Sequence, residues 1–147
     1  MAEVTGAQLV VDSLKREGVD TVYVLPGDPV GGIVNGLARA GLKVIAVRHE
    51  QVAAHAAEGW AKVTGKPGVA IVTAGPGVTD AVTGLANAFQ APSPMVLIGG
   101  NAGIGDHLRG GLQDFDSATF LKPITKFSEQ VKRTDRIADY VSIAFRH

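Results

Sequence analysis

Glu50 has the residue type and the surroundings that acid–base chemistry needs. It follows the apolar stretch 43–47 and begins an alanine-rich helical stretch, in the run Val47-Arg48-His49-Glu50-Gln51. A carboxylate held at the end of a buried strand can share a proton with a nitrogen atom of a heterocycle. Taken alone, Glu50 would more often be an ordinary acid at a helix start, favoured by the helix dipole, and His49 a packed or solvent-facing histidine.

The glycine-rich segment Thr73-Ala74-Gly75-Pro76-Gly77 is a second candidate for ligand binding. It follows an apolar run and precedes a helical pattern, as dinucleotide-binding loops do, but the motif G-x-G-x-x-G is incomplete because Asp80 occupies its sixth position. No G-K-[ST] run is present either. Two interpretations stay open: a tight turn between strand and helix, or a turn that lets a flat ligand approach the backbone.

Short apolar stretches predict the strands that would position these residues. They cover residues 21–25, 43–47, 68–74 and 94–99. Patterns of helical spacing alternate with them, over residues 5–18, 30–41, 50–65 and 78–89. This alternation predicts an α/β fold with a doubly wound, mainly parallel sheet and helices on both faces. Ligands bind such sheets outside the C-terminal strand ends. The loops expected at that edge are 26–29, 48–51 and 74–77.

Local signals predict where several helices begin. Thr5 and Gln8 have the spacing of a capping box. Thr134 is expected to cap a last helix, whose apolar residues continue to Ala144. A short helix is expected near 113–120. Because the chain ends inside the last helical pattern, we expect residues 1–147 to be one domain of a longer protein.

Composition excludes several classes of function. The 147 residues contain 14 basic and 14 acidic side chains, which gives no field for nucleic acid or an anionic membrane. There is no cysteine, and the four histidines lack metal-ligand spacing, so no metal site is expected. No apolar run approaches the roughly 20 residues of a membrane span. We find no signal peptide and expect a cytoplasmic protein.

The order of several short motifs resembles one family of enzymes. The segments are Arg48-His49-Glu50, Ala56-Ala57-Glu58-Gly59, Thr64-Gly65, Thr73-Ala74-Gly75-Pro76-Gly77, Thr83-Gly84, Leu112-Gln113 and Pro123-Ile124-Thr125-Lys126. Together they resemble the N-terminal pyrimidine-binding domain of thiamine-diphosphate enzymes of the acetolactate synthase group. That group includes benzaldehyde lyase, 2-hydroxyacyl-CoA lyases and related 2-oxo acid decarboxylases.

The resemblance implies roles for individual residues. A glutamate at the Glu50 position hydrogen-bonds the pyrimidine N1′ of thiamine diphosphate and promotes the tautomer that removes the proton from thiazolium C2. Gln113 matches a glutamine that faces the substrate in the acetolactate synthase and benzaldehyde lyase branch. The positions that match those lining the pyrimidine are Pro26, Gly27, Thr73, Gly75, Pro76 and Gly77. The cofactor supplies the organic chemistry, and the protein orients it.

Two aspartates depart from the pattern. Asp80 stands where the group usually has asparagine, which puts one hydrogen bond near the cofactor in doubt, although an acid at the third helical position would still cap the helix. Asp28 resembles an aspartate that transfers protons in the pyruvate decarboxylase branch, but that branch's paired histidines are missing. Asp28 could equally be a plain turn residue beside Pro29.

The magnesium motif of this family, Gly-Asp-Gly followed by a downstream asparagine, does not occur in the chain. The resemblance therefore implies that Mg²⁺ and the diphosphate are held by the diphosphate-binding domain of a second subunit, in a homodimer or homotetramer. The alanine-rich stretch 53–61 would suit close packing at that interface, although core packing predicts the same composition. Two alternatives remain: a separate pyrimidine subunit of a two-chain decarboxylase, and a non-catalytic module that binds a nucleotide or another small ligand.

Overall fold

A four-stranded parallel sheet forms the centre of the protein, whose computed structural model describes residues 4–107 and 109–147. The strands are β1 (Thr21–Val24), β2 (Lys43–Ala46), β3 (Gly68–Val72) and β4 (Met95–Gly99). They lie in the order β2-β1-β3-β4, and every neighbouring pair is parallel. β1, β2 and β3 end one or two residues before the apolar runs that predicted them, where the chain enters its loops.

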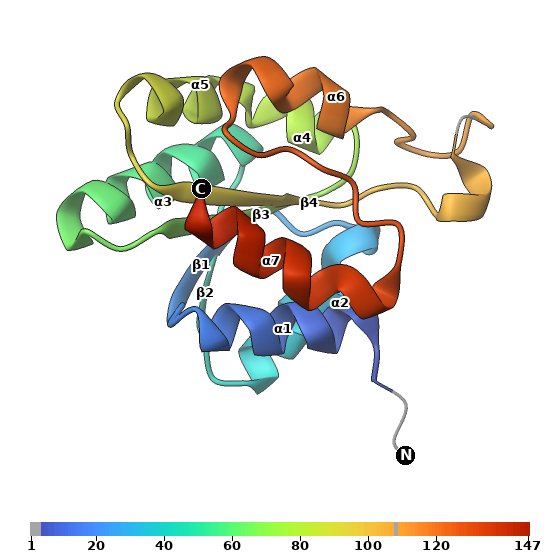
Figure 1. The fold of residues 1–147 in the computed structure, drawn as a ribbon, viewed down its shortest axis with the longest axis horizontal. Coiled ribbons are helices and arrows are strands. Elements are labelled where there is room, and N and C mark those ends of the chain that lie inside the picture. The colour runs from blue at the N-terminus through green and yellow to red at the C-terminus, as the bar shows by residue number, and fades with distance from the viewer. Residues whose placement is uncertain (1–3, 108) are drawn as a thin grey trace.

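Helices cover both faces of the sheet, which confirms the predicted doubly wound α/β fold (Figure 1). One face carries α1 (Gly6–Arg16), α2 (Asp28–Arg39) and α7 (Ile137–Arg146). The other carries α3 (Glu50–Thr64), α4 (Pro76–Asp80), α5 (Val82–Gln90) and α6 (Ser117–Leu121). In the described parts of the chain, no helix combines the length and the apolar character needed to cross a membrane.

The sheet separates two apolar cores, and β3 contributes to both. Its five residues are all buried. Val69 and Ile71 pack with α1 and α2, while Ala70 and Val72 pack with α3 and α4. This alternation follows from strand geometry, since successive side chains point to opposite faces.

The alanine-rich face of α3 lies in the second of these cores. Ala53, Ala54 and Ala57 are fully buried. A Cβ on Gly84 would lie 2.5 Å from the Ala54 Cβ, so α5 approaches α3 as closely as small side chains allow. The alanines therefore pack within the domain itself, which agrees with the core-packing interpretation of their composition.

The capping signals are confirmed in part. The Thr5 hydroxyl oxygen accepts a hydrogen bond from the backbone N–H of Gln8 at 3.2 Å and caps α1. The Gln8 side chain instead donates to Asp12 at 2.9 Å, so only half of the predicted capping box forms. Gly65 ends α3 in the left-handed region, at φ 71°, which glycine adopts without steric cost.

Three local predictions are wrong. The helix expected over 78–89 is two helices, α4 and α5, which meet at Ala81. Asp80 is the last residue of α4 and does not cap it, because α4 begins two residues earlier than predicted and Val78 takes the third position. Thr134 begins a 3-10 turn, and no side chain caps α7. The short helix near 113–120 forms, but over Ser117–Leu121.

The strand order places a topological switch between β1 and β3. From β1 the chain crosses to β2 at one edge, and from β3 it crosses to β4 at the other. The loops after β1 and β3 therefore leave the sheet side by side with their helices on opposite faces. This is the position at which open α/β sheets bind ligands.

Candidate active site

Glu50 is the first residue of α3 and is only 6% exposed. Its position at a helix N-terminus places the carboxylate in the favourable field of the backbone N–H groups. Among residues 4–107 and 109–147, no side chain or backbone donor forms a hydrogen bond or ion pair with it. Buried carboxylates are nearly always partnered. Glu50 is therefore suited to a ligand that donates a hydrogen bond.

His49, the neighbour of Glu50, has a structural role. Its Nδ1 accepts a hydrogen bond from the backbone N–H of Gln51 at 3.2 Å, so His49 is the N-cap of α3. The side chain is exposed. This contact fixes the first turn of the helix and with it the direction of Glu50.

Thr73 brings the loops after β1 and β3 together at the switch. A Cβ on Gly27 would overlap Thr73 Oγ1 and would lie 2.6 Å from the Thr73 Cβ. Only glycine can occupy position 27 in this arrangement. The predicted loop 26–29 therefore contacts Thr73, the residue directly before the predicted loop 74–77.

Gly77 joins Thr73 to Glu50. A Cβ on Gly77 would lie 2.5 Å from Thr73 Cγ2 and 2.9 Å from Glu50 Oε1. Gly77 is the second residue of α4, and it is buried. The Glu50 carboxylate therefore lies against the glycine loop, as the predicted edge arrangement requires.

Gln113 reaches this cluster from a distant part of the chain. The Thr73 hydroxyl donates a hydrogen bond to Gln113 Oε1 at 3.2 Å. A Cβ on Gly75 would lie 2.6 Å from the Gln113 backbone oxygen. Gln113 also has φ 59°, a conformation that non-glycine residues rarely adopt. Such conformations persist where the surrounding structure enforces them, and often at functional sites.

The remaining predicted residues lie around this cluster. Pro26, Asp28, Pro76 and Asp80 are all exposed. Asp28 is the first residue of α2 and directly follows Gly27, so it stands at the edge of the site. Asp80 lies one turn along α4 from Gly77, and no described contact joins it to Glu50, Thr73 or Gln113.

The sequence interpretation missed two contributors at the same edge. A Cβ on Gly100, directly after β4, would lie 2.7 Å from Pro29 Cβ and 3.1 Å from the Ala74 nitrogen. His107 Nδ1 lies 2.9 Å from Asp114 Oδ1 beside Gln113. Gly100 could have been found from the sequence, because it is a glycine directly after a predicted strand. Nothing in the spacing of His107 and Asp114 indicated that they form a pair.

A surface hollow lies at the other end of the sheet. It has a volume of about 250 Å³ and is lined by residues 17–21 and 66–67, together with Trp60 and Phe145. It contains none of the predicted site residues. In the described part of the chain, no group of three or more histidine or acidic side chains is placed to hold a metal ion.

The donors and acceptors at the switch fit a flat, nitrogen-containing ring. The buried Glu50 carboxylate is an acceptor, the Thr73 hydroxyl and the Gln113 amide can each donate or accept, and Gly75 and Gly77 keep side chains out of the way. The aminopyrimidine of thiamine diphosphate has this chemistry. A diphosphate does not match an acceptor carboxylate.

Comparison with known proteins agrees with this assignment. Residues 4–120 match the family model described as thiamine pyrophosphate enzyme, N-terminal TPP binding domain. The chain is 40% identical to the acetolactate synthase of Bacillus subtilis over 96% of its own length and 25% of that protein. It is 44% identical to an acetolactate synthase large subunit of Mycobacterium tuberculosis, over 82% of this chain and 22% of that protein. It is 39% identical to 2-hydroxyacyl-CoA lyase 2 of Danio rerio, over 92% of this chain and 22% of that protein.

The fold and the site together define a thiamine-diphosphate-binding α/β domain. The chain belongs to the family of N-terminal domains of thiamine pyrophosphate enzymes, of the acetolactate-synthase-like kind. It spans about a quarter of the length of the curated relatives that it matches.

Proposed function

We propose that this domain binds the aminopyrimidine of thiamine diphosphate in an enzyme that forms or cleaves carbon–carbon bonds of 2-oxo acids or 2-hydroxyacyl compounds. The observation that carries the proposal is Glu50, a buried carboxylate that has no partner among the described residues and lies against Gly77 at the switch of the sheet. The relatives named acetolactate synthase and 2-hydroxyacyl-CoA lyase support the substrate class.

Each residue of the site has a definite task in this proposal. Glu50 shares a proton with the pyrimidine N1′: the carboxylic acid donates to the ring nitrogen, and the carboxylate accepts from the protonated ring. Thr73, Gly75 and Gly77 present small groups and backbone to the ring, and Pro26, Gly27, Pro76 and Asp80 line its margins. When bound, the cofactor supplies a thiazolium carbon that becomes a nucleophile on losing its proton. The protein contributes orientation and the placement of charge.

Gln113 and Asp28 set the fate of the reaction in the proposed enzyme. Gln113 offers only neutral hydrogen bonds to the acyl group, so it protonates a carbanion poorly and leaves time for a second carbonyl compound to react. Asp28 would supply a proton and favour release of an aldehyde. The contact of Gln113 with Thr73 supports the first outcome, whereas Asp28 is exposed at the edge of the site.

The other half of the site comes from elsewhere in the proposed enzyme. A diphosphate-binding domain of a second subunit holds Mg²⁺ and the diphosphate, which makes the enzyme a homodimer or homotetramer in the cytoplasm. The relatives are about four times as long as the matched region, so they have room for such a domain.

Ligand-dependent thermal stabilisation of the complete enzyme tests this proposal. Thiamine diphosphate with Mg²⁺ should raise the melting temperature, and NAD or ATP with Mg²⁺ should not, because only a ligand that binds the native state stabilises it. A smaller thiamine diphosphate effect in Glu50→Gln would assign the pyrimidine part of the binding to this site. Equal stabilisation by all three ligands would refute the proposal and favour a general nucleotide-binding module.

A further inference from the structure

His107 and Asp114 form a polar contact beside the site that the mechanism leaves unused. His107 Nδ1 lies 2.9 Å from Asp114 Oδ1, and the Asp114 side chain is only 5% exposed. Burial of a carboxylate costs free energy unless a donor forms a hydrogen bond with it. His107 can donate this hydrogen bond in either protonation state, because its Nδ1 carries a hydrogen in the cation and in one neutral tautomer.

Little regular structure holds the segment in which this pair lies. Between β4 and α6, the regular structure in the described residues is one 3-10 turn, Ile104–Asp106. Glycines occupy positions 103, 105, 110 and 111, and each gives the chain extra conformational freedom to lose on ordering. A contact across seven residues removes part of that freedom before any ligand binds.

Gln113 is the residue that depends most on this ordering. It is adjacent to Asp114, its backbone has φ 59°, and its carbonyl oxygen packs against Gly75. The backbone N–H of Asp114 donates to the Gly111 oxygen at 3.1 Å, so a turn and the His107 contact act on the residue directly after Gln113. A left-handed conformation at a glutamine needs such external support.

We propose that His107 and Asp114 are a positioning pair that fixes Gln113 against Thr73 and Gly75 and thereby sets the binding of the acyl substrate. The inference rests on the proposed function, since it assumes that Gln113 faces the substrate. The pair acts through Gln113 and leaves Glu50 untouched, because Glu50 is held by α3 and Gly77. His107 and Asp114 lie in the loop between β4 and α6, outside the strands and helices that form the two apolar cores.

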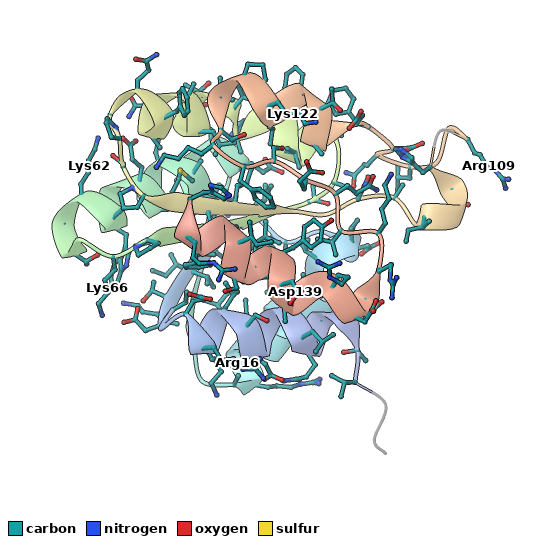
Figure 2. All side chains as sticks on the ribbon, in the orientation of Figure 1. Arg16, Lys62, Lys66, Arg109, Lys122 and Asp139 are labelled. Carbon is teal, nitrogen blue, oxygen red and sulfur yellow. The ribbon has the colours of Figure 1, made fainter. Side chains whose placement is uncertain are left out.

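The first test is deuterium uptake of the unliganded protein over residues 107–116. His107→Leu removes the Nδ1 contact with Asp114 and should raise uptake there. His107→Asn should restore protection, because the Asn amide offers an N–H near the position of Nδ1. Arg109→Ala is the matched control: Arg109 is exposed and projects from the same segment into solvent (Figure 2). Unchanged uptake in His107→Leu would overturn the inference, whether or not the enzyme uses thiamine diphosphate.

The second test is steady-state kinetics of the complete enzyme. His107→Leu should raise the KM for the acyl substrate by about 10- to 100-fold, the cost of a misplaced positioning group. The rate of C2–H exchange of bound cofactor should stay as in the wild type, and His107→Asn should recover most of the KM. Increased uptake with an unchanged KM would overturn the positioning role. Absence of C2–H exchange in the wild type would instead refute the proposed function.

Discussion

The backbone oxygen of Gln113 lies against the α-carbon of Gly75, so closely that a Cβ on Gly75 would be 2.6 Å from it. Gly75 itself has φ 52° and ψ −106°, where a side chain is strained whatever the space around it. The loop that contains Gln113, the predicted substrate-facing residue, thus packs directly against the loop that contains Gly75 and Gly77. Any change at Gly75 affects both.

Gly75→Ala should destabilise the fold and displace Gln113. The new methyl group adds a clash to a backbone that alanine tolerates poorly, so the free energy of unfolding should fall by about 2 kcal/mol or more. Gly65→Ala is the matched control, because Gly65 has φ 71° and open space around it. Gly65→Ala should lower the free energy of unfolding by only about 1 kcal/mol, because only its backbone conformation is unfavourable for alanine. Urea denaturation of both variants measures the difference, and equal losses would contradict the close packing of Gln113 on Gly75.

Glu50→Gln should nearly abolish C2–H exchange of the bound cofactor in the complete enzyme. The amide cannot exchange a proton with the pyrimidine nitrogen, and one positioned acid–base group contributes about 10²- to 10⁴-fold. The fold should persist, since the two side chains have almost the same shape. Exchange followed by NMR after acid quench gives the rate, with the exposed Glu129→Gln as control. Near-normal exchange in the variant would remove Glu50 from the mechanism.

The 147 residues alone should bind thiamine diphosphate weakly or not at all. The site offers an acceptor carboxylate and small polar groups, and the described residues contain no cluster that could hold the Mg²⁺ needed by the diphosphate. Isothermal titration calorimetry of this chain with and without Mg²⁺ measures the affinity. Micromolar, Mg²⁺-dependent binding would be incompatible with a diphosphate site on another domain.

The products of the reaction show whether Gln113 or Asp28 determines the fate of the intermediate. With pyruvate and with 2-hydroxyacyl substrates, the complete enzyme should mainly form or cleave carbon–carbon bonds, and Gln113→Ala should lower this activity more than Asp28→Ala does. Chromatography of the products quantifies both outcomes. Free aldehyde as the main product would reverse our assignment, if activity also collapsed in Asp28→Ala and survived in Gln113→Ala.

Glu58 should make the stability of the domain sensitive to acid. Glu58 is 3% exposed, and its carboxylate accepts hydrogen bonds from Asn87 Nδ2 at 2.6 and 2.7 Å and pairs with Lys62, which projects from α3 (Figure 2). Burial raises the pKa of Glu58, but the hydrogen bonds from Lys62 and Asn87 outweigh it and hold that pKa below its ordinary value of 4.5. The folded state therefore binds this proton less readily than the unfolded chain does.

It follows that the contribution of Glu58 is complete above pH 4.5 and is lost as the pH falls through its lowered pKa. Glu58→Gln should reduce the free energy of unfolding at neutral pH by about 1–3 kcal/mol, because the buried donors lose a charged acceptor. This difference from the wild type should shrink in acid. Melting temperatures between pH 7 and pH 3 test the trend, and the exposed Glu17→Gln should show none of it. A difference that is constant with pH would show that the charge of Glu58 is not involved.

The sequence predicted the sheet, the two helical layers and the meeting of the loops after β1 and β3. The spacing of apolar residues indicates the strands and helices, and the glycines indicate the loops. The sequence also placed Glu50 beside Gly77, because the C-terminal ends of parallel strands share one edge. The sequence contains no comparable signal for the break between α4 and α5 at Ala81. Its residues keep a continuous helical pattern, and only the backbone shows the break.

Gln113 was identified by resemblance alone. Its contact with Thr73 spans 40 residues of sequence, and its left-handed backbone is imposed by packing on Gly75 rather than by its own preference. The pair of His107 and Asp114 was missed for a related reason. A histidine and an aspartate seven residues apart in a loop carry no periodicity, so their contact depends on the path of the chain between two elements.

Because the side chains of β3 enter both apolar cores, neither layer of helices can detach while the other stays intact. Opening either core would expose one face of a strand whose backbone is hydrogen-bonded to β1 and β4. We therefore expect the domain to unfold in a single cooperative transition, with no intermediate in which half the helices persist. In a larger enzyme, this cooperativity would transmit strain at one helical layer to the ligand edge of the sheet.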